Sequence, residues 1–188
     1  MVAGEAMQHQ YHVRSGMLKS SFINSQGDEC VTGFYLPGEA VPVFATGGQQ
    51  THSVIALEET SVCAVHLSRH LTPDAKQVPI WQALFQHTQA TTSQALGHQL
   101  NIRHPSAEAR FAGFCVDLMQ RLAVLQREQH HLPTPMTRTD IASYLGLTLE
   151  SLSRVMSRMK RKQIIEASRS HINILQPERL QSLAAHLH

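Results

Sequence analysis

The chain has 188 residues, of which 42% are hydrophobic, and a formal net charge of +2. This length suits one long domain or two small ones, and the apolar content is sufficient for a buried core, which excludes a largely disordered chain. No run approaches the ~18 apolar residues of a membrane span, and the N-terminus lacks the layout of a secretion signal. We therefore expect a cytoplasmic protein without a membrane partner. Cys30, Cys63 and Cys115 are too few and too widely spaced for a disulfide framework.

The first 70 residues are predicted to form short strands separated by glycine-containing turns, which is typical of a sandwich or barrel. The β-prone runs are residues 11–13, 17–23, 31–36 and 61–67. From residue 72 to residue 102 glycine and proline are scarce, and this stretch is predicted to be a long helix. A second helix begins at Pro105 and Ser106 and continues to about Leu125, with apolar residues at helical spacing.

The last third of the chain predicts a helix, a turn, a helix, a hairpin and a final helix, after a loop at residues 127–135. Thr137 is a suitable N-cap, and Asp140 three residues later completes a capping-box-like pair. Gly146 and Leu147 predict a tight turn, and Thr148 caps the next helix. This spacing is the helix-turn-helix layout.

Positive charge is concentrated in this part of the chain. Residues 137–162 contain six cationic and two anionic side chains, a local balance of +4. A basic patch is the expected footprint of contact with nucleic acid phosphates, although a solvated basic helix would have the same composition.

The second helix of the motif, from Leu149 to about Lys162, separates into two faces. The apolar face, expected to pack inward, consists of Leu149, Leu152, Val155, Met156 and Met159. The opposite face offers a carboxylate for cytosine N4 in Glu150, a hydroxyl for a base edge in Ser153 and a guanidinium for guanine in Arg154. An ordinary amphipathic surface helix would show the same separation.

The residues after this helix favour the DNA-binding interpretation. Residues 164–166 and the alternating residues 171–174 predict a β-hairpin, with a turn at residues 168–170. A hairpin directly after a basic helix is the wing of a winged helix, and Arg169 at its tip lies where a phosphate would be reached.

The run from Met136 to Arg154, which contains Thr-Arg-Thr-Asp-Ile-Ala and Tyr-Leu-Gly-Leu-Thr, resembles the DNA-binding signature of the Crp/Fnr superfamily. The resemblance is to the branch named for the fumarate and nitrate reduction regulator. It continues upstream through Gly27-Asp28-Glu29, Gly38-Glu39 and Ala56-Leu57-Glu58, and covers essentially the whole chain.

The resemblance implies an α+β protein in three parts. They are an incomplete β-roll sensor domain (1–72), a dimerisation helix (73–103) and a winged helix-turn-helix domain (104–188). It also implies a homodimer that activates transcription, contacts RNA polymerase and reads a palindromic site in double-stranded DNA with half-sites resembling TTGAT. Base contacts are expected from Glu150, Ser153 and Arg154. Backbone or supporting contacts are expected from Thr137, Arg138, Thr148, Ser157, Arg158 and Arg169.

The residues say less about the signal to which the protein responds. Members that bind cyclic nucleotides carry an arginine in the phosphate loop, but residues 49–53 contain none, which argues against that ligand. Oxygen-sensing members hold a [4Fe–4S] cluster with four cysteines, and only Cys63 matches a ligand position here. We therefore expect no cofactor for this chain, and a cluster with Cys63 as ligand only in a longer product.

Two hypotheses about the input therefore remain open. In the first, Met1 is an internal methionine of a longer reading frame that encodes an oxygen or redox sensor. In the second, the short chain is natural and either responds to another small effector or has no input. An enzyme is not expected, because the thirteen histidines show no recognisable metal-ligand spacing and no phosphate-binding loop or activated nucleophile is evident.

Overall fold

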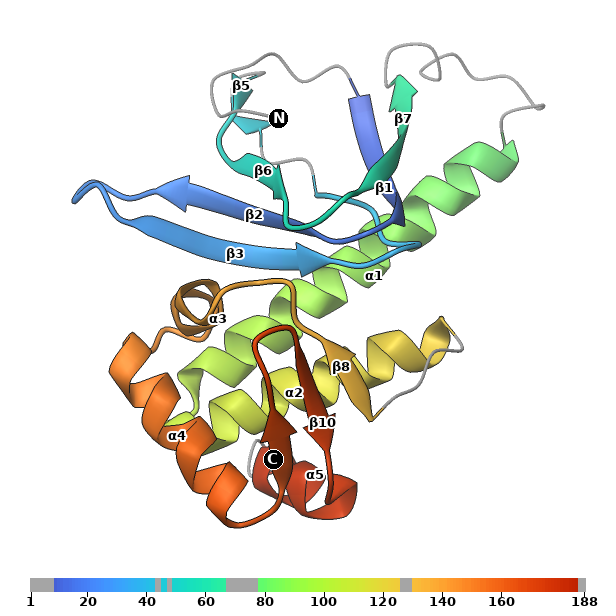
Figure 1. Ribbon diagram of the computed structural model, residues 1–188. Coiled ribbons are helices and arrows are strands. Elements are labelled where there is room, and N and C mark those ends of the chain that lie inside the picture. Colours follow the sequence, from blue (N-terminus) through green and yellow to red (C-terminus); the bar gives the residue numbers. More distant parts are fainter. Residues whose placement is uncertain (1–8, 43–44, 47–48, 67–77, 126–129, 186–188) are drawn as a thin grey trace. The chain divides into compact units, whose positions relative to one another are not determined.

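A computed structural model describes residues 9–42, 45–46, 49–66, 78–125 and 130–185 (Figure 1). The chain divides into two compact units, residues 1–96 and 97–188. The fold is α+β, as predicted: the described part of the first unit is mainly sheet, and the second unit contains a helix-turn-helix. Among the described residues, no helix combines the length and apolar character required to cross a membrane.

The strands of the first unit form three small antiparallel sheets. β1 (His9–Ser15) pairs with β7 (Ser61–His66), and β2 (Leu18–Ile23) lies between β3 (Glu29–Tyr35) and β6 (Ser53–Ala56). The third sheet is the short pair β4 (Ala45–Thr46) and β5 (Gln49–Gln50). The predicted runs correspond to β1, β2, β3 and β7, whereas the sequence did not reveal β4, β5 and β6, which are too short to show a hydrophobic period.

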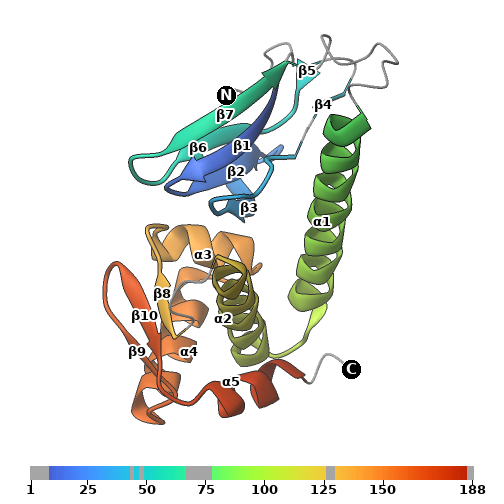
Figure 2. The same cartoon turned by 90° about the vertical axis from the view of Figure 1, so that its right-hand side faces the viewer.

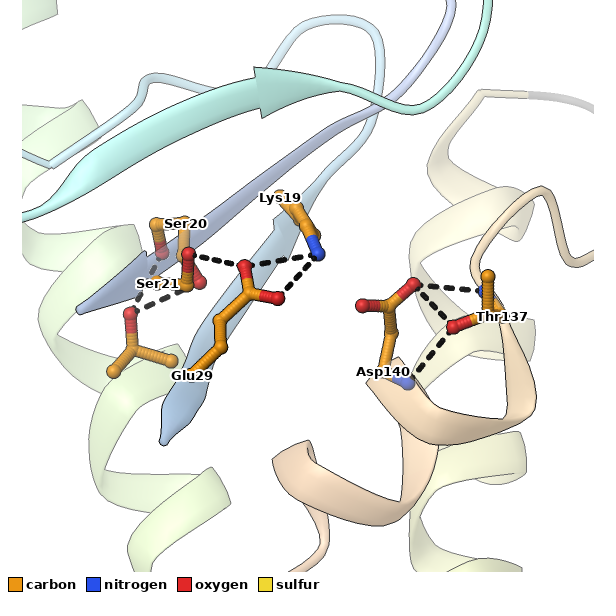
Figure 3. A network of polar contacts seen from close by, with 7 residues as sticks. Lys19, Ser20, Ser21, Glu29, Thr137 and Asp140 are labelled. Atoms are coloured by element: carbon orange, nitrogen blue, oxygen red, sulfur yellow. Dashed lines mark hydrogen bonds and ion pairs between the residues drawn. The ribbon is translucent and has the colours of Figure 1, made fainter. Parts of the chain in front are cut away.

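One hydrophobic cluster in the core of this unit consists of Val13, Leu18, Tyr35, Val41 and Val54, with Tyr11 packed against them. The central strand β2, which pairs with β3 and β6, also buries polar residues. Lys19 is 8% exposed, and its Nζ lies 3.0 Å from Glu29 Oε1 (Figure 3). The Ser21 hydroxyl donates to the same carboxylate oxygen at 2.7 Å. These contacts give the buried polar groups of Lys19 and Ser21 a partner; left unpaired, such groups would destabilise the sheet.

Helix α1 (Val78–Arg103) follows, and it accounts for most of the predicted helix 72–102, whose first six residues lie outside the described residues. Large apolar side chains remain exposed along it: Phe85 at 63%, Leu96 at 57% and Leu100 at 62%. Spacings of eleven and four residues place these three side chains near one stripe of the helix.

The helices of the second unit lie close together (Figure 2) and bury apolar side chains. α2 (Ala107–Val124) contributes Phe111, Cys115, Leu118 and Leu122, which are all at most 1% exposed. The other elements, in chain order, are β8 (His131–Pro133), α3 (Arg138–Tyr144), α4 (Leu149–Arg161), β9 (Ile165–Ala167), β10 (His171–Ile174) and α5 (Pro177–Ala184).

The prediction of a loop over residues 127–135 was wrong at β8. Residues 131–133 pair with β10 in a sheet of order β8-β10-β9. His131-Leu132-Pro133 is too short to show a strand pattern, and only the partner strand identifies it. Leu132 is fully buried, so the pairing also adds a residue to the core.

Candidate nucleic-acid interface

The first helix of the motif begins at a complete capping box. The Thr137 side chain accepts from the Asp140 backbone N–H at 3.0 Å, and Asp140 Oδ2 accepts from the Thr137 backbone N–H at 2.9 Å (Figure 3). The pair satisfies amide groups that an uncapped helix leaves without partners. The predicted capping role of Thr137 and Asp140 is confirmed.

The turn between α3 and α4 depends on Gly146, whose φ of +61° lies in the left-handed region that favours glycine. Arg110, on α2, donates from Nη1 to the carbonyl oxygens of Leu145 at 3.3 Å and Gly146 at 3.2 Å. These bonds satisfy turn carbonyls that the helices leave unpaired. Thr148 then caps α4 and accepts from the Ser151 backbone N–H at 3.1 Å. The turn is therefore fixed by local chemistry and by α2.

The inner face of α4 packs as predicted, with one exception. Leu152 and Met159 are 0% exposed, and Val155 and Met156 are 6% and 7% exposed. Leu149, which we expected to pack inward, is 47% exposed. It is the first residue of the helix, where the described elements leave it about half exposed.

The outer face of α4 presents the three predicted base-contacting residues, Glu150, Ser153 and Arg154, all exposed. Arg154 Nη1 lies 2.8 Å from Glu150 Oε1, and the two side chains remain 64% and 77% exposed. Such an exposed pair one helical turn apart is worth only about 0.3–0.5 kcal/mol. Either side chain can therefore leave its partner for a base edge at little cost.

Three of the residues predicted to give backbone or supporting contacts have exposed side chains: Thr137, Thr148 and Ser157. The first two also act as helix caps. Arg138 is partly buried and donates from Nη2 to the Ser168 carbonyl oxygen of the hairpin turn. Burial lowers the pKa of Arg138, while the neighbouring Cys115 has the opposite effect. Arg158 pairs with Glu108 at 3.3 Å.

The hairpin of β9 and β10 forms as predicted, with the turn at residues 168–170. Ser168 organises this turn: its backbone N–H donates to His171 O at 2.9 Å, and its hydroxyl lies 2.8 Å from His171 Nδ1. Lys160 Nζ also donates to Ala167 O at 3.4 Å. Arg169 at the tip is exposed. A helix-turn-helix followed by such a hairpin defines the class of winged-helix DNA-binding proteins.

The comparisons with known proteins give the family. Residues 109–183 match the Crp-like helix-turn-helix domain, and residues 1–71 match the cyclic nucleotide-binding domain. The chain is 31% identical over 185 residues to the fumarate and nitrate reduction regulatory protein of Salmonella typhimurium, covering 98% of this chain and 74% of that protein. The protein of the same name from Vibrio cholerae is 32% identical over 186 residues, covering 97% and 73%.

Among solved structures, FixK2 from Bradyrhizobium japonicum superposes with a TM-score of 0.81 at 27% identity, covering 96% of this chain and 89% of that chain. The chain therefore belongs to the Crp/Fnr family, within its Fnr-like branch, and is a DNA-binding transcription regulator. The first unit contains the cyclic-nucleotide-binding-like domain of that family.

The cysteines do not fit a four-thiolate cluster within one copy of this chain. The sequence has three cysteines, and Cys115 is 0% exposed, with burial raising the pKa of its thiol to about 12. Such a thiol resists the deprotonation that metal binding requires. Cys63 on β7 is exposed, whereas Cys30 on β3 is half-buried. The described residues contain no group of three or more histidine, cysteine or acidic side chains suited to a metal ion.

One feature of the first unit was not found from the sequence. A cavity of about 250 Å³ is lined by Gln10, His12, Ala40, Pro42, His87, Thr88, Thr91 and Thr92. The rings of His12 and His87 meet edge to face, with centroids 4.6 Å apart. Burial, and secondarily the charge of His87, lower the pKa of His12. Among the described residues, this lining contains no arginine or lysine that would pair with a phosphate.

Proposed function

We propose that this regulator acts as a homodimer that reads a palindromic DNA site through the outer face of α4, with half-sites resembling TTGAT. The observation that carries the proposal is the exposed trio of Glu150, Ser153 and Arg154 on a capped helix whose other face is buried. Glu150 would accept from cytosine N4, Arg154 would pair with guanine O6 and N7, and Ser153 would bond a neighbouring base edge.

Around this trio we assign the backbone contacts to Thr137, Thr148, Ser157 and Arg169, whose side chains are exposed. Arg138 and Arg158 have supporting roles, since the first fastens the hairpin turn and the second bridges α4 to α2. Phosphate contacts of this kind fix the register of the protein on the duplex, while base contacts supply the specificity.

Dimerisation through α1 is supported by the exposed apolar side chains of Phe85, Leu96 and Leu100. Exposed apolar residues aligned on one helix stripe favour pairing with a second copy. A two-fold dimer would place its recognition helices about one DNA turn apart, ~34 Å. The polar middle of α1, which contains His87 and Gln94, would keep the association weak enough to be regulated.

The test is a pair of arginine variants with opposite expected signatures. Arg154→Ala should cost about 1–3 kcal/mol and relax the preference at one base position. Arg169→Ala should weaken binding to all duplexes alike and reduce the salt dependence of binding by about one phosphate contact. Arg179→Ala is the matched control, because Arg179 is exposed on α5 and bonds only to Gln176 among the described residues.

Selection from a randomised duplex library, followed by titration of operator and random DNA, measures these effects. An equal loss for Arg154→Ala on operator and random DNA would contradict its assignment to a base. A loss for Arg169→Ala at one base position alone would contradict its assignment to a phosphate.

For the input, we propose that the protein activates transcription with RNA polymerase in response to oxygen or redox state. The support is the Fnr-like sequence and the exposed thiol of Cys63. A [4Fe–4S] cluster belongs to a product with additional cysteines, in which Cys63 would be a ligand. Iron and acid-labile sulfide should be measured after anaerobic purification of the product expressed from its own gene. Loss of iron in Cys63→Ser but not in Cys30→Ser is expected; absence of iron from the unaltered product would refute the cluster.

A second candidate input is a small effector in the cavity lined by His12 and His87. It is favoured by the polar lining, in which the described residues include no arginine or lysine. Three threonines and an amide supply hydrogen bonds without a phosphate partner, so a neutral compound fits better than a cyclic nucleotide. Addition of cyclic AMP or cyclic GMP should leave the melting temperature unchanged. A clear stabilisation by either nucleotide would contradict this interpretation of the lining.

A further inference from the structure

The carboxylate of Glu108 is shared between two cations of the recognition helix. Glu108 is the second residue of α2, and its side chain is only 14% exposed. Its Oε2 lies 3.3 Å from Arg158 Nη1, and its Oε1 lies 3.1 Å from Lys162 Nζ. Each carboxylate oxygen of Glu108 therefore pairs with a different cation near the C-terminal end of α4.

The two cations are placed where they would otherwise be available to DNA. Arg158 lies on the outer face of α4, one turn beyond Arg154, and Lys162 caps the end of that helix. Their side chains are 54% and 42% exposed, so neither is enclosed by protein apart from the Glu108 contact. A free arginine or lysine on this face would pair with any nearby phosphate, whatever the sequence.

The three groups differ in how much solvent screens them. The side chains of Arg158 and Lys162 are exposed to solvent. The Glu108 carboxylate that joins them is mostly buried and lies in the first turn of α2. The positive end of the helix dipole stabilises a carboxylate at this position. The Glu108 carboxylate is therefore held in place, whereas the long cationic side chains would otherwise move freely.

From this geometry we infer that Glu108 acts as an internal substitute for a DNA phosphate. It withholds Arg158 and Lys162 from the DNA backbone and thereby limits the sequence-independent part of DNA binding. Base reading by Glu150, Ser153 and Arg154 is left untouched, because the ion pair between Arg154 and Glu150 is internal to α4. Such a residue keeps affinity for random DNA low while the recognition helix remains basic. This role rests on the DNA-binding face assigned to α4.

The test compares Glu108→Gln with Glu178→Gln on a random duplex, in the full chain. Both residues are the second residue of their helices, so both changes remove one negative charge at an equivalent place. Glu178 forms no ion pair within the described residues, which makes it the matched control. Affinity should be measured from 50 to 200 mM salt, and thermal stability should be recorded for each variant.

Glu108→Gln is expected to bind random DNA more tightly than the unaltered protein at low salt. Two released cations add a log–log salt slope of about 1.8 for each recognition helix engaged, at ~0.9 per phosphate. For each recognition helix engaged, its affinity should therefore fall about twelve-fold more than that of the unaltered protein across this salt range. Glu178→Gln should show neither change in slope nor this gain.

A further variant separates this role from a structural one. Adding Arg158→Gln and Lys162→Gln to Glu108→Gln should abolish the extra slope, whereas the same two changes in the unaltered protein should leave its slope unchanged. If Glu108 only braces α2 against α4, Glu108→Gln will lower the melting temperature and weaken binding without altering the slope, and the inference is overturned. Failure of the base-contact assignment would appear separately, as an unaltered base preference in Arg154→Ala.

Discussion

Removal of the Asp140 carboxylate tests how the first helix of the motif is held. In Asp140→Ala, the Thr137 backbone N–H and hydroxyl lose an acceptor that lies 2.9 Å and 2.7 Å away. The reciprocal bond from the Asp140 N–H to Thr137 remains, so half of the capping box survives. The change therefore removes the charged half of the cap and leaves the neutral half.

The magnitude follows from the burial of the two partners. Loss of a capping side chain costs about 0.5–2 kcal/mol, and hydrogen bonds to charged groups are worth about 1.5–3 kcal/mol. Thr137 is exposed, so water replaces part of what its donors lose, whereas Asp140 is 6% exposed and leaves a small void. We expect Asp140→Ala to lower the free energy of unfolding of the second unit by about 1–3 kcal/mol.

Urea unfolding followed by circular dichroism measures this difference. Asp140→Asn should lose less, because its amide oxygen still accepts from Thr137 while only the charge near the helix N-terminus is lost. Thr139→Ala is the control, since Thr139 is exposed on the same helix. A loss below about 0.5 kcal/mol for Asp140→Ala, or one equal to that of Thr139→Ala, would refute the reasoning. Base preference at a permissive temperature should be unaltered.

Two further predictions concern titratable groups. His98 stacks on Tyr144 with ring centroids 3.9 Å apart, and its buried Nδ1 finds no hydrogen-bond partner among the described residues. Burial lowers the pKa of His98 from 6.5 despite the opposing charge of Asp117. The unfolded state therefore binds a proton first, so stability should be constant above pH 6.5 and fall as the pH drops from there toward the folded pKa. His98→Phe, which keeps the stack, should flatten this dependence in melting curves, and an unchanged dependence would exclude His98 as its source. Because burial raises the pKa of Cys115 to about 12, its thiol should react with a disulfide reagent at pH 8 only on unfolding, whereas the exposed Cys63 reacts in the native protein. Rapid modification of native Cys115, detected by mass spectrometry, would contradict the burial.

In the DNA-binding unit, most local features of the structure were predicted from the sequence. The caps at Thr137 and Thr148, the Gly146 turn, the two faces of α4 and the hairpin at residues 165–174 were all predicted from the chain. Each depends on residues within about one helical turn of one another, or on a hairpin whose strands are adjacent in sequence. Local preferences and short-range periodicity are sufficient for such features.

The contacts between segments far apart in the chain were determined only by the tertiary structure. β8 is a strand because β10 lies beside it, Arg110 completes the Gly146 turn from α2, and Glu108 reaches Lys162 from 54 residues away in the chain. None of these contacts has a sequence period or a fixed spacing, because each depends on how elements pack. The sequence by itself determined the family and predicted the face of α4 that we propose reads DNA. The packing determined that Arg158 and Lys162, near this face, form ion pairs with Glu108. An ion pair between residues far apart in the chain forms only once the helices that carry them have come together.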